Sequence, residues 1–423
     1  MTSKRVFPIH TDTSCLLKWA WSTVFLRQGK SASCHRTDQH AIPLDNFASF
    51  HNLPEKIRAR ETMLAGEWPQ GGCQYCEKIE KSGGMSDRQY QLHAHHDEYQ
   101  TPSELLVDPA QTHVVPTILE VYFNNTCNMS CLYCGSHFSS KWEEENRRFG
   151  EFKTGKVHFG WDLKQPDLDY QHMLKEFWRY LHEEDRYLKI RQYQIAGGEP
   201  FHQEELEQSI EFWDAHPNPE VAFNFITNLK VSPRKFQSTI ERLGRMVEQG
   251  KIKRVQISSS LDSWGPQQEY VRWGLDLNEW TENFEYLLDK PWVQQCINSA
   301  INPLSIHTTP ELIRRLNAWN DRKVGGFISY SFMTVMFPGY MDPAIFGGGV
   351  FDKAFEEILG ELRDTHPHEK SIKEHMAGIA QQVSKAQRDP VMIDALKTYL
   401  DEIDRRRGTD WRSLFPWLDQ DWK

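Results

Sequence analysis

The stretch ILEVYFNNTCNMSCLYC, residues 118–134, decides the predicted fold. Its first six residues are apolar or alternating and predict a short β-strand. A polar loop follows directly and carries Cys127, Cys131 and Cys134 with the spacing C-x3-C-x2-C. Three thiolates this close on one loop can hold three corners of a cubane iron–sulfur cluster. Three ligands for four irons leave one iron open, and an open metal position is a place for chemistry.

A zinc site is the alternative for the same loop. His137 lies three residues after Cys134 and could supply a fourth ligand. Either metal requires a loop that brings the three thiols together.

Outward from this loop, short apolar or alternating runs recur and predict six β-strands. They are residues 118–123, 193–196, 221–227, 255–258, 296–301 and 327–333. Amphipathic stretches lie between them, at 171–188, 203–215, 233–249 and 310–320. Strands that alternate with helices predict parallel βαβ units. The fold class is therefore α/β, and six strands favour a partial (β/α)6 TIM-like barrel over a closed eight-stranded one.

Four regions follow from these patterns. Residues 1–90 form a cysteine-rich N-terminal module, and residues 91–116 form a linker. The linker contains His93, His95 and His96, which we interpret as part of a polar connector rather than a metal site. The barrel covers residues 117–335, and residues 336–423 form a helical extension that packs on or caps it.

Composition narrows the class of protein. The chain has 423 residues, a net charge of −10 and no basic stripe, which disfavours a nucleic-acid partner. No apolar run approaches the ~18 residues that cross a bilayer, so no membrane partner is expected. The N-terminus lacks a signal-peptide pattern, and we expect a cytoplasmic protein with reduced thiols. Cys296 stands in an apolar run and is interpreted as a core thiol.

The cysteine loop and a second motif together resemble the signature of the radical S-adenosylmethionine (SAM) superfamily. The aromatic Tyr133 precedes Cys134, and the second strand is followed by GGEP at residues 197–200. The resemblance covers residues 117–335. It implies a [4Fe–4S] cluster on Cys127, Cys131 and Cys134, whose open iron is chelated by SAM. It further implies reductive cleavage of SAM to a 5′-deoxyadenosyl radical that abstracts hydrogen from a substrate.

The same resemblance implies SAM contacts at the strand ends. Gly197 and Gly198 would let the backbone approach the SAM amino group, because a Cβ would obstruct it. Glu199 and Pro200 would shape that turn, and Arg272 could bind the SAM carboxylate with both prongs of its guanidinium. The remaining candidates are Tyr133, Thr227, Asn228, Ser258, Ser260 and Asn298.

The N-terminal cysteines form a second pattern, C-x13-G-x4-C followed by C-x2-C, with Gly29 as its glycine. The cysteines are Cys15, Cys34, Cys73 and Cys76. The pattern resembles the SPASM and twitch auxiliary-cluster modules, although here the module precedes the barrel. The resemblance implies a hairpin strand at the run WSTVFL and a second, fully ligated [4Fe–4S] cluster. A four-cysteine zinc site is the alternative.

Two clusters and SAM predict an enzyme that carries out an oxidative modification. The substrate is a peptide, crosslinked or dehydrogenated, or alternatively a small molecule such as an amino acid, aminosugar or nucleoside. A reductant such as flavodoxin or ferredoxin is the expected partner. For electron transfer we expect the auxiliary site near the carboxyl ends of the strands, reached by folding of the module across the barrel mouth. A non-catalytic zinc-binding protein is the third hypothesis.

Overall fold

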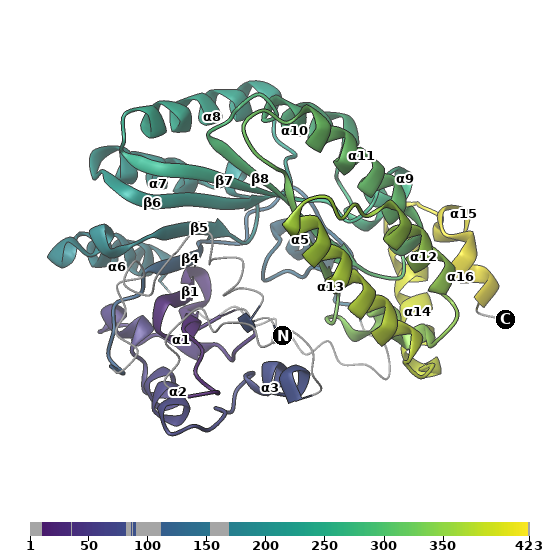
Figure 1. Cartoon of the computed structure of the whole chain (residues 1–423), viewed down its shortest axis with the longest axis horizontal. Helices are drawn as coiled ribbons and strands as arrows, with labels where there is room; N and C mark the ends of the chain where they lie inside the picture. The colour runs from purple at the N-terminus through teal and green to yellow at the C-terminus, as the bar shows by residue number, and fades with distance from the viewer. Residues whose placement is uncertain are drawn as a thin grey trace.

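Figure 1 shows the computed structural model of the chain, which describes residues 11–34, 36–81, 86, 88, 89, 111–152 and 169–421. The described strands form one sheet of nine, in the order β3-β2-β1-β4-β5-β6-β7-β8-β9. Strands β4 to β9 each pair in parallel with the next. The protein is therefore a mixed α/β structure around a mostly parallel sheet.

All six predicted strands are confirmed. They are β4 (Ile118–Tyr122), β5 (Gln192–Ala196), β6 (Asn218–Thr227), β7 (Ile252–Ser260), β8 (Val293–Ile301) and β9 (Ser329–Thr334). Their chain order is also their order in the sheet, as expected when each strand returns beside the previous one through a helix.

The predicted amphipathic stretches are helices that connect these strands. They are α6 (Tyr170–His182), α7 (Glu204–Ala215), α8 (Pro233–Glu248) and α11 (Thr309–Arg322), with α5 (Ser140–Phe149), α9 (Pro266–Val271) and α10 (Leu277–Tyr286) in addition. In α8, Phe236, Ile240 and Leu243 are fully buried. Their i, i+4, i+7 spacing places all three on one helix face, which packs against the core.

The two faces of the sheet differ in chemistry. On β6, Phe223 and Phe225 are fully buried, and Phe223 stacks on Tyr193, whose hydroxyl bonds Ser209 of α7. Asn224 lies between the two phenylalanines and therefore faces the other side. Strand register aligns Asn224 with Gln194 of β5 and with Gln256 of β7, so a polar row crosses the side opposite the helices.

The N-terminal residues extend this sheet rather than forming a separate unit. Strand β1 (Trp21–Phe25) pairs in parallel with β4, and β2 (Lys30–Ala32) and β3 (His40–Ala41) continue antiparallel from it. This confirms the predicted hairpin strand. Gly29 makes the turn with φ +59°, a conformation that favours glycine. Helices α1 (Leu17–Ala20) and α2 (Pro54–Leu64) pack on the hairpin, and the residues just before α3 (Gln74–Lys81) contact the segment that follows β2.

The predicted linker is described only from residue 111 onward; His93, His95 and His96 lie outside the described residues. Residues 111–114 are bound to the N-terminal module. The Trp19 indole donates to the Gln111 carbonyl, and Asn52 donates to the Val114 carbonyl at 2.9 Å. This part of the predicted linker is therefore anchored rather than a free connector.

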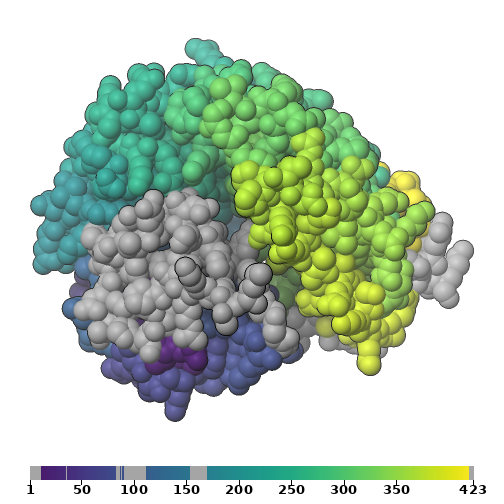
Figure 2. All heavy atoms as spheres, viewed as in Figure 1, coloured from purple at the N-terminus to yellow at the C-terminus, as the bar shows by residue number. Residues whose placement is uncertain are grey.

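The C-terminal residues are helical, as predicted. They form α12 (Asp352–Glu361), α13 (Pro367–Ser384), α14 (Pro390–Arg407), α15 (Trp411–Leu414) and α16 (Pro416–Asp421). In Figure 2 these helices (yellow-green) and the N-terminal module (purple to blue) lie at different margins of the visible face. Among the described residues, no helix combines the length and apolarity needed to span a membrane.

Candidate metal centres

Cys127, Cys131 and Cys134 lie on the loop after β4, outside helices and without disulfide bonds. Neighbouring segments hold the loop by its backbone. The Leu132 amide donates to the Val271 carbonyl at 2.9 Å, and the Cys127 amide donates to the Ser140 hydroxyl at 3.1 Å. The loop is thus fixed by the segments after β7 and by the start of α5.

Cys131 lies near the other two thiols of the loop. Burial raises the pKa of all three thiols, that of Cys134 to about 12. Cys131 also contributes to the raised pKa of Cys127 and of Cys134, which means that the thiols lie close together. Buried thiols that hinder each other's ionisation become thiolates when a metal supplies positive charge. This chemistry fits a cluster site.

His137, the candidate fourth ligand of the zinc alternative, lies three residues after Cys134. His137 lies against the ring of Phe138, with ring centroids 4.2 Å apart. The described residues contain no group of three or more His, Cys, Asp or Glu placed to hold a single metal ion.

The GGEP turn after β5 packs directly on the cysteine loop. Gly197 and Gly198 have φ of +76° and +57°. A Cβ on Gly197 would lie 2.2 Å from the Tyr122 ring, and one on Gly198 would lie 2.4 Å from the Thr126 carbonyl oxygen. The structure therefore requires both glycines for contact between two loops, a reason that the sequence analysis did not foresee.

Glu199 ties this turn to the end of β6. Its carboxylate accepts hydrogen bonds from the Phe201 amide at 3.1 Å, the Thr227 hydroxyl at 2.7 Å and the Asn228 amide at 2.6 Å. Burial nevertheless raises its pKa to about 7. The hydroxyl of Thr227, which was predicted to bind SAM, donates its hydrogen bond to this carboxylate. Pro200 begins the short 3-10 turn that follows.

Asn228 lies beside the first cysteine. Its side-chain amide nitrogen donates to the Asn128 side chain at 2.9 Å and is 3.9 Å from the Cys127 sulfur. Asn128 in turn donates to the Lys230 carbonyl at 2.7 Å. The structure thus brings the predicted residues of β6 to the cysteine loop.

Arg272 and Tyr133 meet at a residue that the sequence analysis missed. Arg272 binds Asp262 with both prongs, at 2.9 and 2.8 Å, and the Tyr133 hydroxyl donates to Asp262 at 2.6 Å. Arg272 also bonds the Cys131 thiol and lowers its pKa, against the larger effect of burial. The Arg272 guanidinium, which was predicted to bind the SAM carboxylate, therefore binds Asp262 instead. Asp262 closely follows β7, and this position at a strand end could have identified it as a candidate site residue.

The remaining candidates lie on β7 and β8. Register pairs Ser258 with Cys296 and Ser260 with Asn298. The Cys296 thiol is 3.6 Å from the Asn298 amide oxygen and also bonds Ser258. Interpretation of Cys296 as an apolar core thiol was wrong, because strand alternation turns it to the polar side of the sheet.

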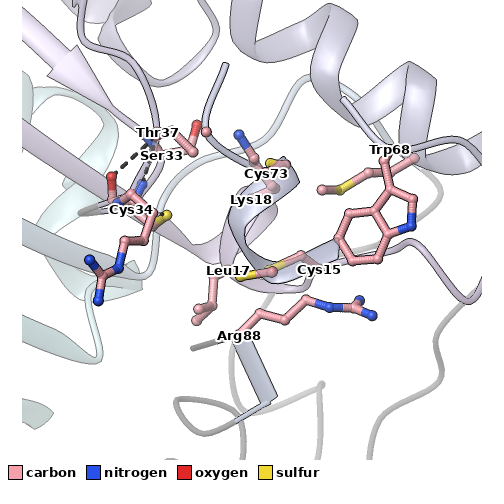
Figure 3. A pocket seen from close by; sticks show the side chains of 13 residues that line it. Cys15, Leu17, Lys18, Ser33, Cys34, Thr37, Trp68, Cys73 and Arg88 are labelled. Carbon is pink, nitrogen blue, oxygen red and sulfur yellow. Dashed lines mark hydrogen bonds between the residues drawn. The ribbon is translucent and has the colours of Figure 1, made fainter. Parts of the chain in front are cut away.

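The four N-terminal cysteines converge on one cavity, shown in Figure 3. Cys15 precedes α1, Cys34 follows β2, Cys73 directly precedes α3, and Cys76 lies in the first turn of α3. Cys34 and Cys73 each help to raise the pKa of Cys15, and Cys76 helps to raise that of Cys73. The convergence agrees with the predicted four-cysteine site.

Gly72 explains how α3 reaches Cys34. A Cβ on Gly72 would lie 2.0 Å from the Arg36 carbonyl oxygen, so only glycine allows this approach. The Arg36 amide donates to the Cys34 sulfur at 3.4 Å.

The position of this cavity corrects one prediction. Cys15 and α1 precede β1, and the Thr117 amide at the start of β4 donates to the Ala20 carbonyl at 2.9 Å. The cavity therefore lies at the amino end of β1, whereas Cys127 follows the carboxyl end of β4. The expected placement near the carboxyl ends was wrong, because β1 runs parallel to β4. A five-residue strand separates the two sites by roughly 15 Å.

Comparison with known proteins gives no family for this chain. No protein-family model matches it, and no curated protein matches it. Function must therefore be inferred from the two cysteine sites and the residues around them.

Proposed function

We propose that this protein is a radical SAM enzyme whose parallel sheet and helices form a partial (β/α)6 barrel. The observation that carries the proposal is the junction of three loops at one edge of the sheet. Hydrogen bonds join the cysteine loop, the GGEP turn and the end of β6. The Glu199 backbone amide donates to the Thr126 carbonyl at 2.8 Å, and the Glu199 carboxylate accepts from the Asn228 backbone amide. The Asn228 side chain in turn donates to the Asn128 side chain. A C-x3-C-x2-C loop and a GGEP turn in mutual contact match the arrangement that the superfamily resemblance implies.

Cys127, Cys131 and Cys134 would hold a [4Fe–4S] cluster, with SAM at its open iron. Together these groups supply one-electron reduction and hydrogen-atom abstraction from a substrate. The surrounding residues prepare the site. Arg272 donates to Cys131 and favours its thiolate form, and Asp262 fixes the direction of that guanidinium. The three cysteines are half-buried in the loop.

Cys15, Cys34, Cys73 and Cys76 would hold a second [4Fe–4S] cluster with no open iron. Four cysteine ligands suit electron transfer rather than substrate binding. Its place at the amino end of β1 does not meet the placement expected for electron transfer, so the proposed role as acceptor of one electron from a substrate rests on the ligand set alone. This favours an oxidative outcome, with external electrons for SAM cleavage supplied by a flavodoxin or ferredoxin.

The side of the sheet that bears the polar row supports a polar substrate, such as a peptide or an aminosugar. Glu120 accepts hydrogen bonds from Thr23 and Gln194, both at 2.7 Å. Asn224 is buried, and neither atom of its amide has a hydrogen-bond partner within the part of the chain that the structure describes. An amide left this way can bind a ligand that both donates and accepts hydrogen bonds.

The proposal is tested with protein purified without oxygen. Replacing Cys127, Cys131 and Cys134 together by Ala should remove about four of about eight irons per chain and abolish formation of 5′-deoxyadenosine from SAM under reducing conditions. Cys296→Ala is the matched control for loss of a cysteine and should keep all of the iron, because Cys296 belongs to neither set of cluster ligands. SAM cleavage by the triple variant would overturn the assignment. Zinc without iron in the wild-type protein would instead support the non-catalytic hypothesis.

A further inference from the structure

Three cationic side chains are buried around the four N-terminal cysteines. The side chains of Lys18, Lys56 and Arg60 are only 6%, 2% and 0% exposed, respectively. Lys18 lines the cavity itself, where Figure 3 shows it beside Cys73. The other two extend from α2, which packs behind the hairpin.

Within the residues that the structure describes, none of these three cations has a carboxylate partner. Lys56 donates to the Ser22 and Ser31 hydroxyls and to the Ala32 carbonyl, at 2.9, 2.5 and 3.0 Å. The hydrogen bonds of Arg60 likewise go to neutral groups: the carbonyls of Lys18, His51 and Thr112, the Asn52 side chain and the His51 ring. Buried cations are unfavourable unless an anion lies near them.

The cysteines are the groups placed to supply that anion. Lys18 and all four cysteines line one cavity, and Lys56 donates to the carbonyl of Ala32, two residues before Cys34. Arg88 also lines the cavity, but Glu80 pairs with it and offsets its charge. Neutral thiols cannot balance the buried cations, whereas four thiolates on a metal centre carry net negative charge.

We propose that the cavity holds an anionic four-thiolate iron–sulfur centre and that Lys18 sets its reduction potential. This rests on the proposed function in taking the four cysteines as ligands of one cluster. Reduction adds one electron and therefore one negative charge to the centre. A buried ammonium at Cys73 stabilises the reduced form more than the oxidised form, so it raises the potential. A higher potential suits a centre that accepts an electron from a substrate.

The test uses the variant in which Cys127, Cys131 and Cys134 are Ala, so that one cluster remains to be observed. Dithionite reduction is followed by electron paramagnetic resonance at controlled potentials. Lys18→Met in this background should lower the ratio of reduced to oxidised cluster at least tenfold at a fixed potential, equivalent to about 59 mV for one electron. Lys18→Arg should keep most of the wild-type value. Lys30→Met, which removes an exposed cation from β2, should leave the potential unchanged.

A second measurement separates charge from packing. In metal-free protein, Lys18→Met should raise the midpoint temperature of unfolding, because it removes a buried charge that then has no anion. A fall in this temperature would mean that Lys18 acts through packing and would overturn the proposal. An unchanged potential in an iron-loaded Lys18→Met protein would also overturn it, yet leave the proposed function intact. Zinc in the cavity would overturn both the Lys18 role and the auxiliary cluster.

Discussion

Glu199 is a buried carboxyl group that joins two loops of the candidate site. Its pKa is raised from 4.5 to about 7, chiefly by burial. Between these two pH values the folded protein holds a proton that the unfolded chain has lost. The free energy of unfolding therefore falls as pH rises from about 4.5 to about 7 and stays at the lower value above. The difference is roughly 3 kcal/mol at 1.36 kcal/mol per pKa unit.

Glu199→Gln should remove this contribution to the pH dependence, because the amide does not titrate. It should also lower stability by about 1–3 kcal/mol at low pH, since one buried donor loses its acceptor. Thermal unfolding at pH 5 and pH 7.5 measures both effects. Glu204→Gln, an exposed change on the next helix, is the control. An identical pH dependence in wild type and Glu199→Gln would contradict the assignment of the proton to Glu199.

Arg272 shows what sequence reasoning could not predict, namely which side chain binds it. The cysteine loop and the GGEP turn were identified from local spacing alone. The partner of Arg272 was not, because Asp262 lies ten positions earlier and reaches it only through tertiary folding. Spacing identifies which residues can do chemistry; it does not identify which of them bind each other.

Among the elements, α14 holds the cysteine loop by two hydrogen bonds from the C-terminal extension. The Tyr399 hydroxyl donates to the Leu132 carbonyl at 2.7 Å, and Arg407 donates to the Ser130 carbonyl at 3.1 Å. Both acceptors lie within the cysteine loop. The C-terminal extension therefore supports the candidate catalytic site, in agreement with the predicted capping role.

Tyr399→Phe should weaken this support. It leaves a carbonyl beside Cys131 without its buried donor, which costs about 1–3 kcal/mol. We expect a lower unfolding temperature and faster loss of iron to a chelator from the Cys127 site, with the N-terminal centre unaffected. Tyr286→Phe, which removes a hydroxyl bound to Glu241 at the surface, serves as the control. Equal rates of iron loss in wild type and Tyr399→Phe would rule out this role for α14.

The elements also show what pattern analysis can and cannot supply. Alternation of apolar residues predicted all six parallel strands from β4 to β9, because each strand buries one side under its own flanking helices. The strand at WSTVFL was predicted as well, but its partner was not. Pairing of Trp21 with Ile118 joins residues that are distant in the sequence, and no local signal specifies that register or its parallel direction.

For the whole molecule, continuity of the sheet makes the N-terminal module part of the fold. Thr23 of β1 bonds Glu120 of β4, and Phe25 contacts Tyr122, with ring centroids 4.7 Å apart. A chain that begins at residue 111 would leave β4 as an unpaired strand edge, which promotes association. We expect this truncated protein to elute from size-exclusion chromatography as aggregates, and residues 1–110 supplied in trans to restore a soluble complex. A soluble, monomeric truncation would contradict this view.

The pairing of β1 with β4 has a consequence for synthesis of the chain. Thr23 and Glu120 are 97 positions apart, so at about 5–20 residues per second β1 leaves the ribosome some 5–20 s before its partner strand. All four N-terminal cysteines, the last at Cys76, emerge before Cys127 does. The N-terminal hairpin can therefore begin to fold, and to take up metal, before the rest of the sheet exists. The Cys127 site would then assemble after the N-terminal module has been ordered by its own metal centre.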